Sequence, residues 1–315
     1  AGLGSSTQHP RGSVIVTHTY GDEPKGALGV YNFAGDLGKA TFPALTSLLL
    51  LALSWRHAVF VLAAIGVVVA LALAAAHVGP GERDAAPAAD TVAAPAARLG
   101  PSFAVLFVIG VLDTAPRMGF LLLLPFVLGG LHAAPATVGL ALGLVFAGGA
   151  FGKFVCGWVG KKLGFVGTVA TTEGMTALSV LVVPFLPLTA LMVLLPLLGV
   201  ALNGTSTVLY GTVPEAAKGS DFGHAFALFY TGVIGAGALA PIGFGALADA
   251  AGRPAALVCV GLTALLTIPL AFVLARLLKA NEASTAGRRG LAGEPIAVEA
   301  GRDAVRHANA GDGVS

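Results

Sequence analysis

The most constraining feature of this sequence is a series of long apolar runs, each of a length that can cross a bilayer as a helix. About 20 apolar residues span the hydrocarbon core of a membrane. In lipid a backbone must satisfy its own hydrogen bonds, so spans of this length predict helices. Residues 1–20 form a weaker, ninth candidate, which resembles the polar end of a helix. The eight clear runs cover 26–54, 57–77, 102–131, 137–160, 165–187, 189–213, 222–248 and 254–278.

Composition supports lipid as the solvent of this chain. Of its 315 residues, 56% are hydrophobic and 11% are charged, and the mean hydropathy is +0.86. Soluble domains carry about 25% charged residues. The net charge of +2 is too small to indicate nucleic-acid binding. The two cysteines, Cys156 and Cys259, lie inside apolar runs and support neither a disulfide framework nor a zinc site.

The distribution of Lys and Arg predicts the orientation of the spans. If the spans alternate, twelve basic residues fall on one side of the membrane and two, Arg56 and Arg253, on the other. An excess of Lys and Arg marks the cytoplasmic side. We therefore expect the linker and the C-terminus inside the cell, in a multi-pass protein of the bacterial plasma membrane. The twelve are Lys25, Arg83, Arg98, Lys161, Lys162, Lys218 and six residues from Arg276 onward.

Two stretches between and after the spans differ in composition from the rest. Residues 79–101 mix Pro, Ala and charge, which predicts a cytoplasmic linker. Residues 281–315 mix Gly, Ala and charge with little apolar periodicity, which predicts a disordered cytoplasmic tail. The linker separates residues 1–78, with about three spans, from residues 102–280, with six.

The two parts share a weak internal similarity. "YNFAGDLGKATFPAL" at 31–45 resembles "YTGVIGAGALAPIGF" at 230–244, and an arginine and an apolar span follow each. Gly/Ala-rich helices can also align by chance. If the repeat is real, residues 1–78 are the remainder of an N-terminal bundle, and three further spans are expected upstream.

The motifs of the first part carry a family resemblance. "GLGSSTQHP" followed by "YNFAGDLGKATFPALTSLL" and "WR" resembles the fourth and fifth helices of the major facilitator superfamily, and is most similar to the branch of fosmidomycin-resistance-type exporters. The resemblance implies a two-bundle fold in which about nine of twelve helices are present and the chain begins inside the fourth helix. It also implies a secondary transporter that works by alternating access.

Two loops resemble the Gly-x-x-x-Asp-x-x-Gly-Arg signature of the superfamily. "GALADAAGR" supplies Gly245, Asp249, Gly252 and Arg253. In "GWVGKKLG" the matching positions include Gly157, Lys161, Lys162 and Gly164. Lys161 stands where the family has its aspartate, which helps to lock one conformation through charge pairing. We therefore expect a different or weaker lock at this loop.

The charged pair Asp113 and Arg117 is the leading candidate for substrate contact or proton coupling. Ionisable groups inside a span are costly and usually face the interior of a bundle. These two are four residues apart, hence on one helix face, and Pro116 between them loosens the helix. In the resembled fold this is the seventh helix, which lines the central cavity. The alternative is a structural ion pair, in which each charge compensates the cost of burying the other.

Further polar residues within the spans are weaker candidates for the same roles. Asp36 could carry a proton, or could pair with Lys39 or Arg11. His9 and Arg11 could face a water-filled path beside a kink at Pro10, or could mark a helix end at the membrane surface. Three more candidates are Glu173, whose depth the sequence leaves open, Asn203, and Tyr230, which could equally lie in an interfacial aromatic belt. Lys153 is expected to extend toward the membrane surface.

The sequence favours a secondary transporter over other membrane proteins. It contains no Gly-rich phosphate loop followed by Lys-Ser/Thr and no His-Glu-x-x-His helix. We expect no cofactor, no metal and no enzymatic activity, a monomer in the bilayer, and a small organic molecule and protons as partners. Proton-coupled efflux is the first reading and uptake of a small metabolite the alternative. A membrane-embedded enzyme and a non-transporting sensor are further alternatives.

Overall fold

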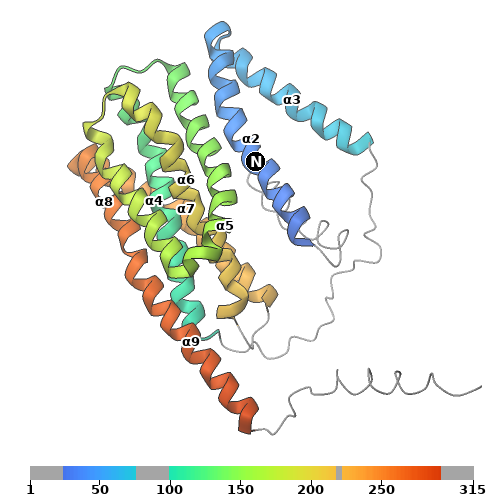
Figure 1. Cartoon of the computed structure of the whole chain (residues 1–315). Coiled ribbons are helices and arrows are strands. Elements are labelled where there is room, and N and C mark those ends of the chain that lie inside the picture. The colour runs from blue at the N-terminus through green and yellow to red at the C-terminus, as the bar shows by residue number, and fades with distance from the viewer. Residues whose placement is uncertain (1–23, 76–98, 218–221, 292–315) are drawn as a thin grey trace, which may run out of the picture.

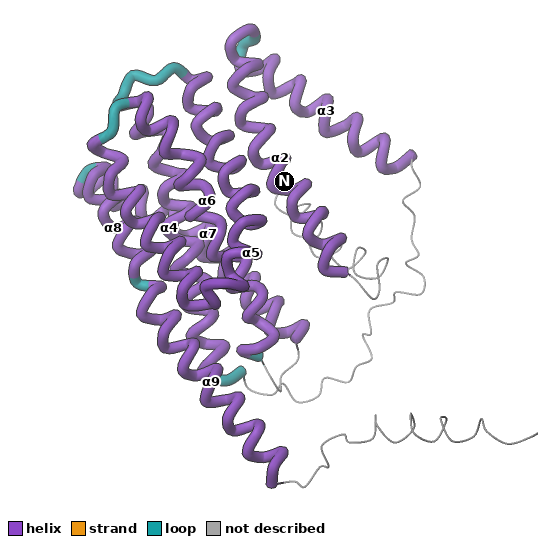
Figure 2. The backbone as a smooth tube through the Cα atoms, in the orientation of Figure 1, coloured by secondary structure: helices purple, strands orange, loops and turns teal. Residues whose placement is uncertain are grey.

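The computed structural model describes residues 24–75, 99–217 and 222–291, and every regular element within these ranges is a helix (Figures 1 and 2). The all-α fold class is therefore confirmed. The candidates His9 and Arg11, and the linker between 76 and 98, lie outside the described residues. The helices are α2 (Pro24–Ala52), α3 (Trp55–Ala75), α4 (Pro101–Gly130), α5 (Pro135–Val182), the short η2 (Val183–Phe185), α6 (Leu188–Ala216), α7 (Phe222–Ala251), α8 (Arg253–Leu265) and α9 (Thr267–Leu291).

The predicted membrane spans agree with the observed helices. Within the described ranges, seven segments are long and apolar enough to cross a membrane. They correspond to the predicted runs from 57–77 onward. The remaining run, 26–54, forms helix α2, in which the apolar part is shorter and covers Leu37–Ala52. The chain is thus a multi-pass helical membrane protein.

Glycine and proline set the breaks between spans. Gly164 has a φ of 68° inside α5, a conformation that glycine tolerates, so α5 consists of two spans joined at this residue. Gly252, with a φ of 88°, precedes Arg253 at the start of α8. The interruption at Leu266 lies three residues before Pro269, which lacks an N–H donor and crowds the preceding turn. Helices α8 and α9 nevertheless form a single candidate span, Arg253–Asn281.

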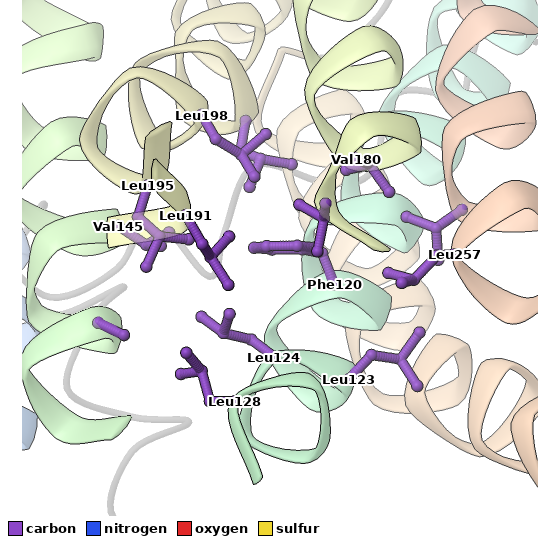
Figure 3. Close-up of a cluster of buried hydrophobic side chains, with 14 of the residues drawn as sticks. Phe120, Leu123, Leu124, Leu128, Val145, Val180, Leu191, Leu195, Leu198 and Leu257 are labelled. Atoms are coloured by element: carbon purple, nitrogen blue, oxygen red, sulfur yellow. The ribbon is translucent and has the colours of Figure 1, made fainter. Parts of the chain in front are cut away.

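A hydrophobic core holds α4, α5, α6 and α8 together. Figure 3 shows Phe120 and Leu124 of α4 among leucines of α6, with Val180 of α5 and Leu257 of α8 beside them. Phe120 and Leu124 are completely buried. A second cluster, around Phe103, Leu106 and Ile109, packs α4 against α6, α7 and α9. The six spans after the linker therefore form one bundle.

Small residues bring α5 and α6 into backbone contact. A Cβ at Gly148 would clash with the carbonyl of Pro196, and one at Gly199 would clash with the carbonyl of Val145. Close approach at small residues is how membrane helices gain van der Waals contact without a hydrophobic driving force. The packing fixes α6 against the first span of α5, and so fixes the polar side chains that follow Gly199 on α6.

Helices α2 and α3 stand beside this bundle (Figure 1). Helix α2 packs against the first span of α5, where Gly139 leaves room for Pro43 and Ser47. Helix α3 packs against α2, and only 6% of its most apolar window is buried. Its hydropathy of 2.9 is the highest of the seven candidate spans, which suits a surface that faces lipid.

The end of the last helix differs from the prediction. We predicted the bundle to end at residue 280 and a disordered tail to follow, but α9 continues to Leu291. Residues 281–291 include Glu, Ala and Arg, which favour helix, and they are polar enough to extend past the membrane. The Asn281 side chain donates a hydrogen bond to Ser102 Oγ at 2.9 Å, which ties this extension to the start of α4.

Candidate functional site

The centre of the bundle contains the predicted pair Asp113 and Arg117 on α4. Asp113 is 4% exposed, and its Oδ2 accepts a hydrogen bond from Arg117 Nη2 at 3.5 Å. Arg117 Nη2 also donates to Thr114 Oγ1 at 3.0 Å. Because i and i+4 side chains share a helix face, α4 alone brings the two charges together. The pair is therefore a buried ion pair whose guanidinium has a further donor to offer.

That donor reaches across to α6. Arg117 Nη1 donates to Asn203 Oδ1 at 3.4 Å, and Asn203 Nδ2 donates to the carbonyl of Gly199 at 3.1 Å. The Asn203 side chain lies over Gly149 of α5, where a larger residue would clash with it. Gly149 on α5 and Gly199 on α6 thus both contact the Asn203 side chain that accepts from the arginine.

Glu173, in the second span of α5, is a second buried carboxyl group. It is 3% exposed, and its Oε1 accepts a hydrogen bond from Thr205 Oγ1 of α6 at 2.6 Å. Thr205 Oγ1 is in turn 2.6 Å from Thr172 Oγ1. The carboxyl groups of Glu173 and Asp113 are close enough to act electrostatically on each other. The burial of Glu173 answers the question of depth that the sequence left open.

Aromatic side chains border this cluster. Tyr230 of α7 stacks on Tyr210 of α6 with ring centroids 5.0 Å apart, and Tyr210 meets Phe229 edge to face at 5.4 Å. A narrow crevice between α4, α6 and α7 connects Tyr210 to Asp113 and Arg117. The crevice is too small for a water molecule. Tyr210 and Tyr230 are both partly buried, and Tyr210 lies at the edge of the charged cluster.

Lys153 is the last residue of the candidate span Pro135–Lys153, and it is half-buried. That its side chain extends toward the membrane surface stays a prediction. Its positive charge also acts on the carboxyl group of Asp113.

The structure describes the remaining predicted residues only in part. The backbone of Asp36 lies in α2, and its side chain is outside the described residues. The first signature stretch, 157–164, lies inside α5, where Gly164 forms the turn and Lys162 is exposed beside it. The second, 245–253, joins the end of α7 to the start of α8, and its Asp249 is exposed. The side chains of Gly157 and Lys161 are not among those described. Gly245 packs near Leu122 of α4.

Arg253 has a contact that its loop position alone does not predict. Its Nη1 donates a hydrogen bond to the carbonyl of Phe126 on α4. This hydrogen bond links the start of α8 to the last turns of α4. The role of Arg253 in the signature loop stays a prediction.

Sequence reasoning missed the hydroxyl groups of the site. Thr114, Thr172 and Thr205 lie in apolar spans where threonine is common and usually bonds to its own helix. A signal was present in "TVATTEGMT" at 168–176, where hydroxyls flank a charged residue. Only the packing of α6 against α5 shows that Thr205 completes the group. No three His, Cys, Asp or Glu side chains that could bind a metal converge anywhere in the described ranges.

Taken together, a helical bundle of membrane-spanning length encloses charged and hydroxyl groups contributed by α4, α5 and α6. Intramembrane charges are expensive, and they are often found on substrate, ion or proton paths. This combination is typical of polytopic membrane transporters.

Comparison with known families gives the same class. A profile of the Major Facilitator Superfamily matches residues 106–308, nearly two thirds of the chain. The chain belongs to the Major Facilitator Superfamily. It is therefore a membrane transporter of this superfamily, a family of transporters and not of enzymes. A search among curated proteins finds no match at significant similarity.

Proposed function

We propose that this protein is a proton-coupled secondary transporter that exports a small organic molecule by alternating access. The observation that carries the proposal is the buried cluster of Asp113, Arg117 and Glu173 at the meeting point of three helices. Two carboxyl groups and one guanidinium in a dry interior give a site whose charge changes by one when a proton enters or leaves.

Export as the direction rests on the resemblance to fosmidomycin-resistance-type exporters in the motifs of residues 2–10 and 31–49. The same cluster would serve uptake, so direction must be measured. In the proposed arrangement the protein is a monomer in the plasma membrane, with residues 79–101 and the C-terminal tail in the cytoplasm. Residues 1–78 and 102–280 belong to two bundles that rock around a midplane site.

The experiment that tests coupling uses inverted membrane vesicles from cells that produce the protein. Respiration acidifies the vesicle lumen, and a pH-sensitive acridine dye reports the gradient. A panel of small phosphonates and lipophilic organic cations is added outside. An exported substrate enters the lumen in exchange for protons, so the dye signal recovers. A symported substrate gives recovery only when it is preloaded inside, which distinguishes the two directions.

Vesicles that contain a control variant or a variant of the cluster are compared with wild-type vesicles. The variant Gly211→Ala, at a glycine of α6 with open space around it, should respond like the wild type. The double variant Asp113→Asn/Glu173→Gln should give no recovery with any compound that the wild type moves. Gradient-independent movement of a labelled compound by the wild type, without any change in dye signal, would contradict proton coupling.

A further inference from the structure

A pocket of about 200 Å³ lies where the ends of three membrane spans meet, away from the charged cluster. Gly130 ends one of these candidate spans, Phe185 ends the second, and Arg253 begins the third. The end of α4, the end of α5 and the start of α8 lie at the same end of the bundle (Figure 1). Because spans of this length end near the surface of the bilayer, the pocket lies close to that surface.

The wall of this pocket is apolar, apart from one arginine. Val183 and Leu257 are at most 2% exposed, and both belong to the hydrophobic core. Pro184 and Pro254 also line the pocket, and proline has no backbone N–H to offer a ligand. Arg253 is the one charged side chain among the lining residues. A ligand that fills the pocket must therefore present hydrocarbon to the wall and a negative charge to the arginine.

The guanidinium of Arg253 is held in place at the edge of the pocket. Its Nη1 donates to the carbonyl of Phe126, and a Cβ added to Gly130 would lie 3.3 Å from the same nitrogen. A guanidinium has five N–H donors in a planar fork, which matches a phosphate group. In the part of the chain that the structure describes, the carbonyl of Phe126 is the one acceptor of this guanidinium. Further donors and the positive charge are thus left for an anionic ligand.

Exposed apolar side chains lie next to the lining residues along the chain. Phe126 is 58% exposed, Phe185 is 83% exposed and Val258 is 43% exposed. Apolar surface of this kind at the end of a bundle indicates contact with the membrane. A free phosphate ion would pair with Arg253 and leave the apolar wall without a partner. A phospholipid, in contrast, carries a phosphate group and hydrocarbon chains side by side at this depth.

We propose that this pocket, the Arg253 pocket, binds an anionic phospholipid. Its phosphate group pairs with the guanidinium of Arg253, and part of one acyl chain enters the apolar pocket. The bound lipid contacts α4, the turn after α5 and the start of α8 together. A ligand that binds only the folded state stabilises that state by mass action, so the lipid strengthens this end of the bundle. The site is independent of the proposed transport mechanism.

Native mass spectrometry of the purified protein in detergent tests the site. The protein is mixed with dioleoyl phosphatidylglycerol, with dioleoyl phosphatidylcholine or with glycerol phosphate. The two lipids share their chains and differ in net charge, whereas glycerol phosphate has the charge without the chains. We expect phosphatidylglycerol to bind about fivefold more tightly than phosphatidylcholine, which corresponds to about 1 kcal/mol for one basic residue near a membrane surface. Glycerol phosphate should not bind.

Variants locate the binding in the Arg253 pocket. Arg253→Gln should remove the preference for phosphatidylglycerol, and Arg253→Lys should keep part of it because the charge remains. Arg56→Gln is the matched control, since Arg56 is an exposed arginine that lies over the ring of Trp55 instead of a pocket. This control should bind both lipids like the wild type. Val127→Phe, which fills the pocket and keeps Arg253, should weaken the binding of both lipids.

Four results would overturn the proposal. They are equal binding of the two lipids by the wild type, equally tight binding of glycerol phosphate, an equal loss of preference in Arg56→Gln and Arg253→Gln, and unchanged lipid binding in Val127→Phe. Size-exclusion chromatography checks that each variant is folded. The comparison of the three ligands needs only the wild type, so the proposal can fail even if a variant does not fold.

Discussion

Arg117 is the residue on which the charged cluster depends, because it serves acceptors on two helices. It donates to Asp113 and Thr114 on its own helix and to Asn203 on α6. Breaking a buried ion pair by removing one partner costs about 3–5 kcal/mol, because the other charge stays buried without compensation. Removing both partners leaves no such charge.

We therefore predict that Arg117→Leu destabilises the protein by about 3–5 kcal/mol and that Asp113→Asn/Arg117→Leu destabilises it much less. Each protein is heated in detergent, and size-exclusion chromatography measures the temperature at which half of it has aggregated. These temperatures rank the stabilities of the wild type, the single variant and the double variant. A double variant as unstable as Arg117→Leu would contradict this account of the pair.

At the scale of the elements, the contact between α5 and α6 depends on individual glycines. Gly199 faces the backbone carbonyl of Val145, while Gly211, on the same helix, has no heavy atom within 4 Å of an added Cβ. We predict that Gly199→Ala destabilises the bundle by about 1–3 kcal/mol or more, because a helix backbone must move to accommodate it. Gly211→Ala should be neutral or slightly stabilising. Thermal unfolding of both variants in detergent measures the difference, and equal stabilities would refute the close packing.

The turn between the two spans of α5 gives a second prediction at this scale. Gly164 has a φ of 68° and a ψ of −179°, a region that is essentially restricted to glycine. We expect Gly164→Ala to cost about 1–3 kcal/mol. Gly174→Ala, in the same helix and with open space around it, is the matched control. Chemical unfolding in mixed micelles compares them. A Gly164→Ala protein as stable as its control would show that the turn adopts another conformation.

For the whole molecule, the arrangement of helix ends permits a test of orientation. The α4–α5 and α7–α8 connections lie at one end of the bundle, and the start of α4 and the end of α9 lie at the other (Figure 1). We predict that Thr91→Cys in the linker and Ala134→Cys label from opposite sides of the membrane. The background should carry Cys156→Ala and Cys259→Ala.

Membrane-impermeant maleimide added to intact cells and to inverted vesicles makes the comparison. Ala134→Cys should react in cells and Thr91→Cys in inverted vesicles, in keeping with the excess of basic residues on the linker side. Reaction of both from the same side would contradict the alternation of spans.

Much of this fold could be predicted because the hydrophobic requirement of a bilayer is local. About 20 consecutive apolar residues identify a span independently of the helices that pack against it. The predicted runs from 57–77 to 254–278 therefore match the observed candidate spans. The breaks at Gly164 and Gly252 follow from local backbone chemistry too. The helix from residue 281 to Leu291 was not predicted, because this stretch mixes helix-favouring Glu, Ala and Arg with Gly, Ser and Thr, and such a composition is compatible with both a helix and a disordered tail.

The sequence by itself determined the spans, the all-helical class and the pairing of Asp113 with Arg117, since an i,i+4 pair needs only one helix. Only the tertiary structure decided that Glu173 and Thr205, which are 32 residues apart, are hydrogen-bonded to each other and lie close to that pair. Their meeting depends on how closely α5 and α6 approach at their glycines and on the turn at Gly164. A hydrogen bond between helices has a reach of about 3 Å, and no periodicity along a single helix fixes a distance of that kind between two.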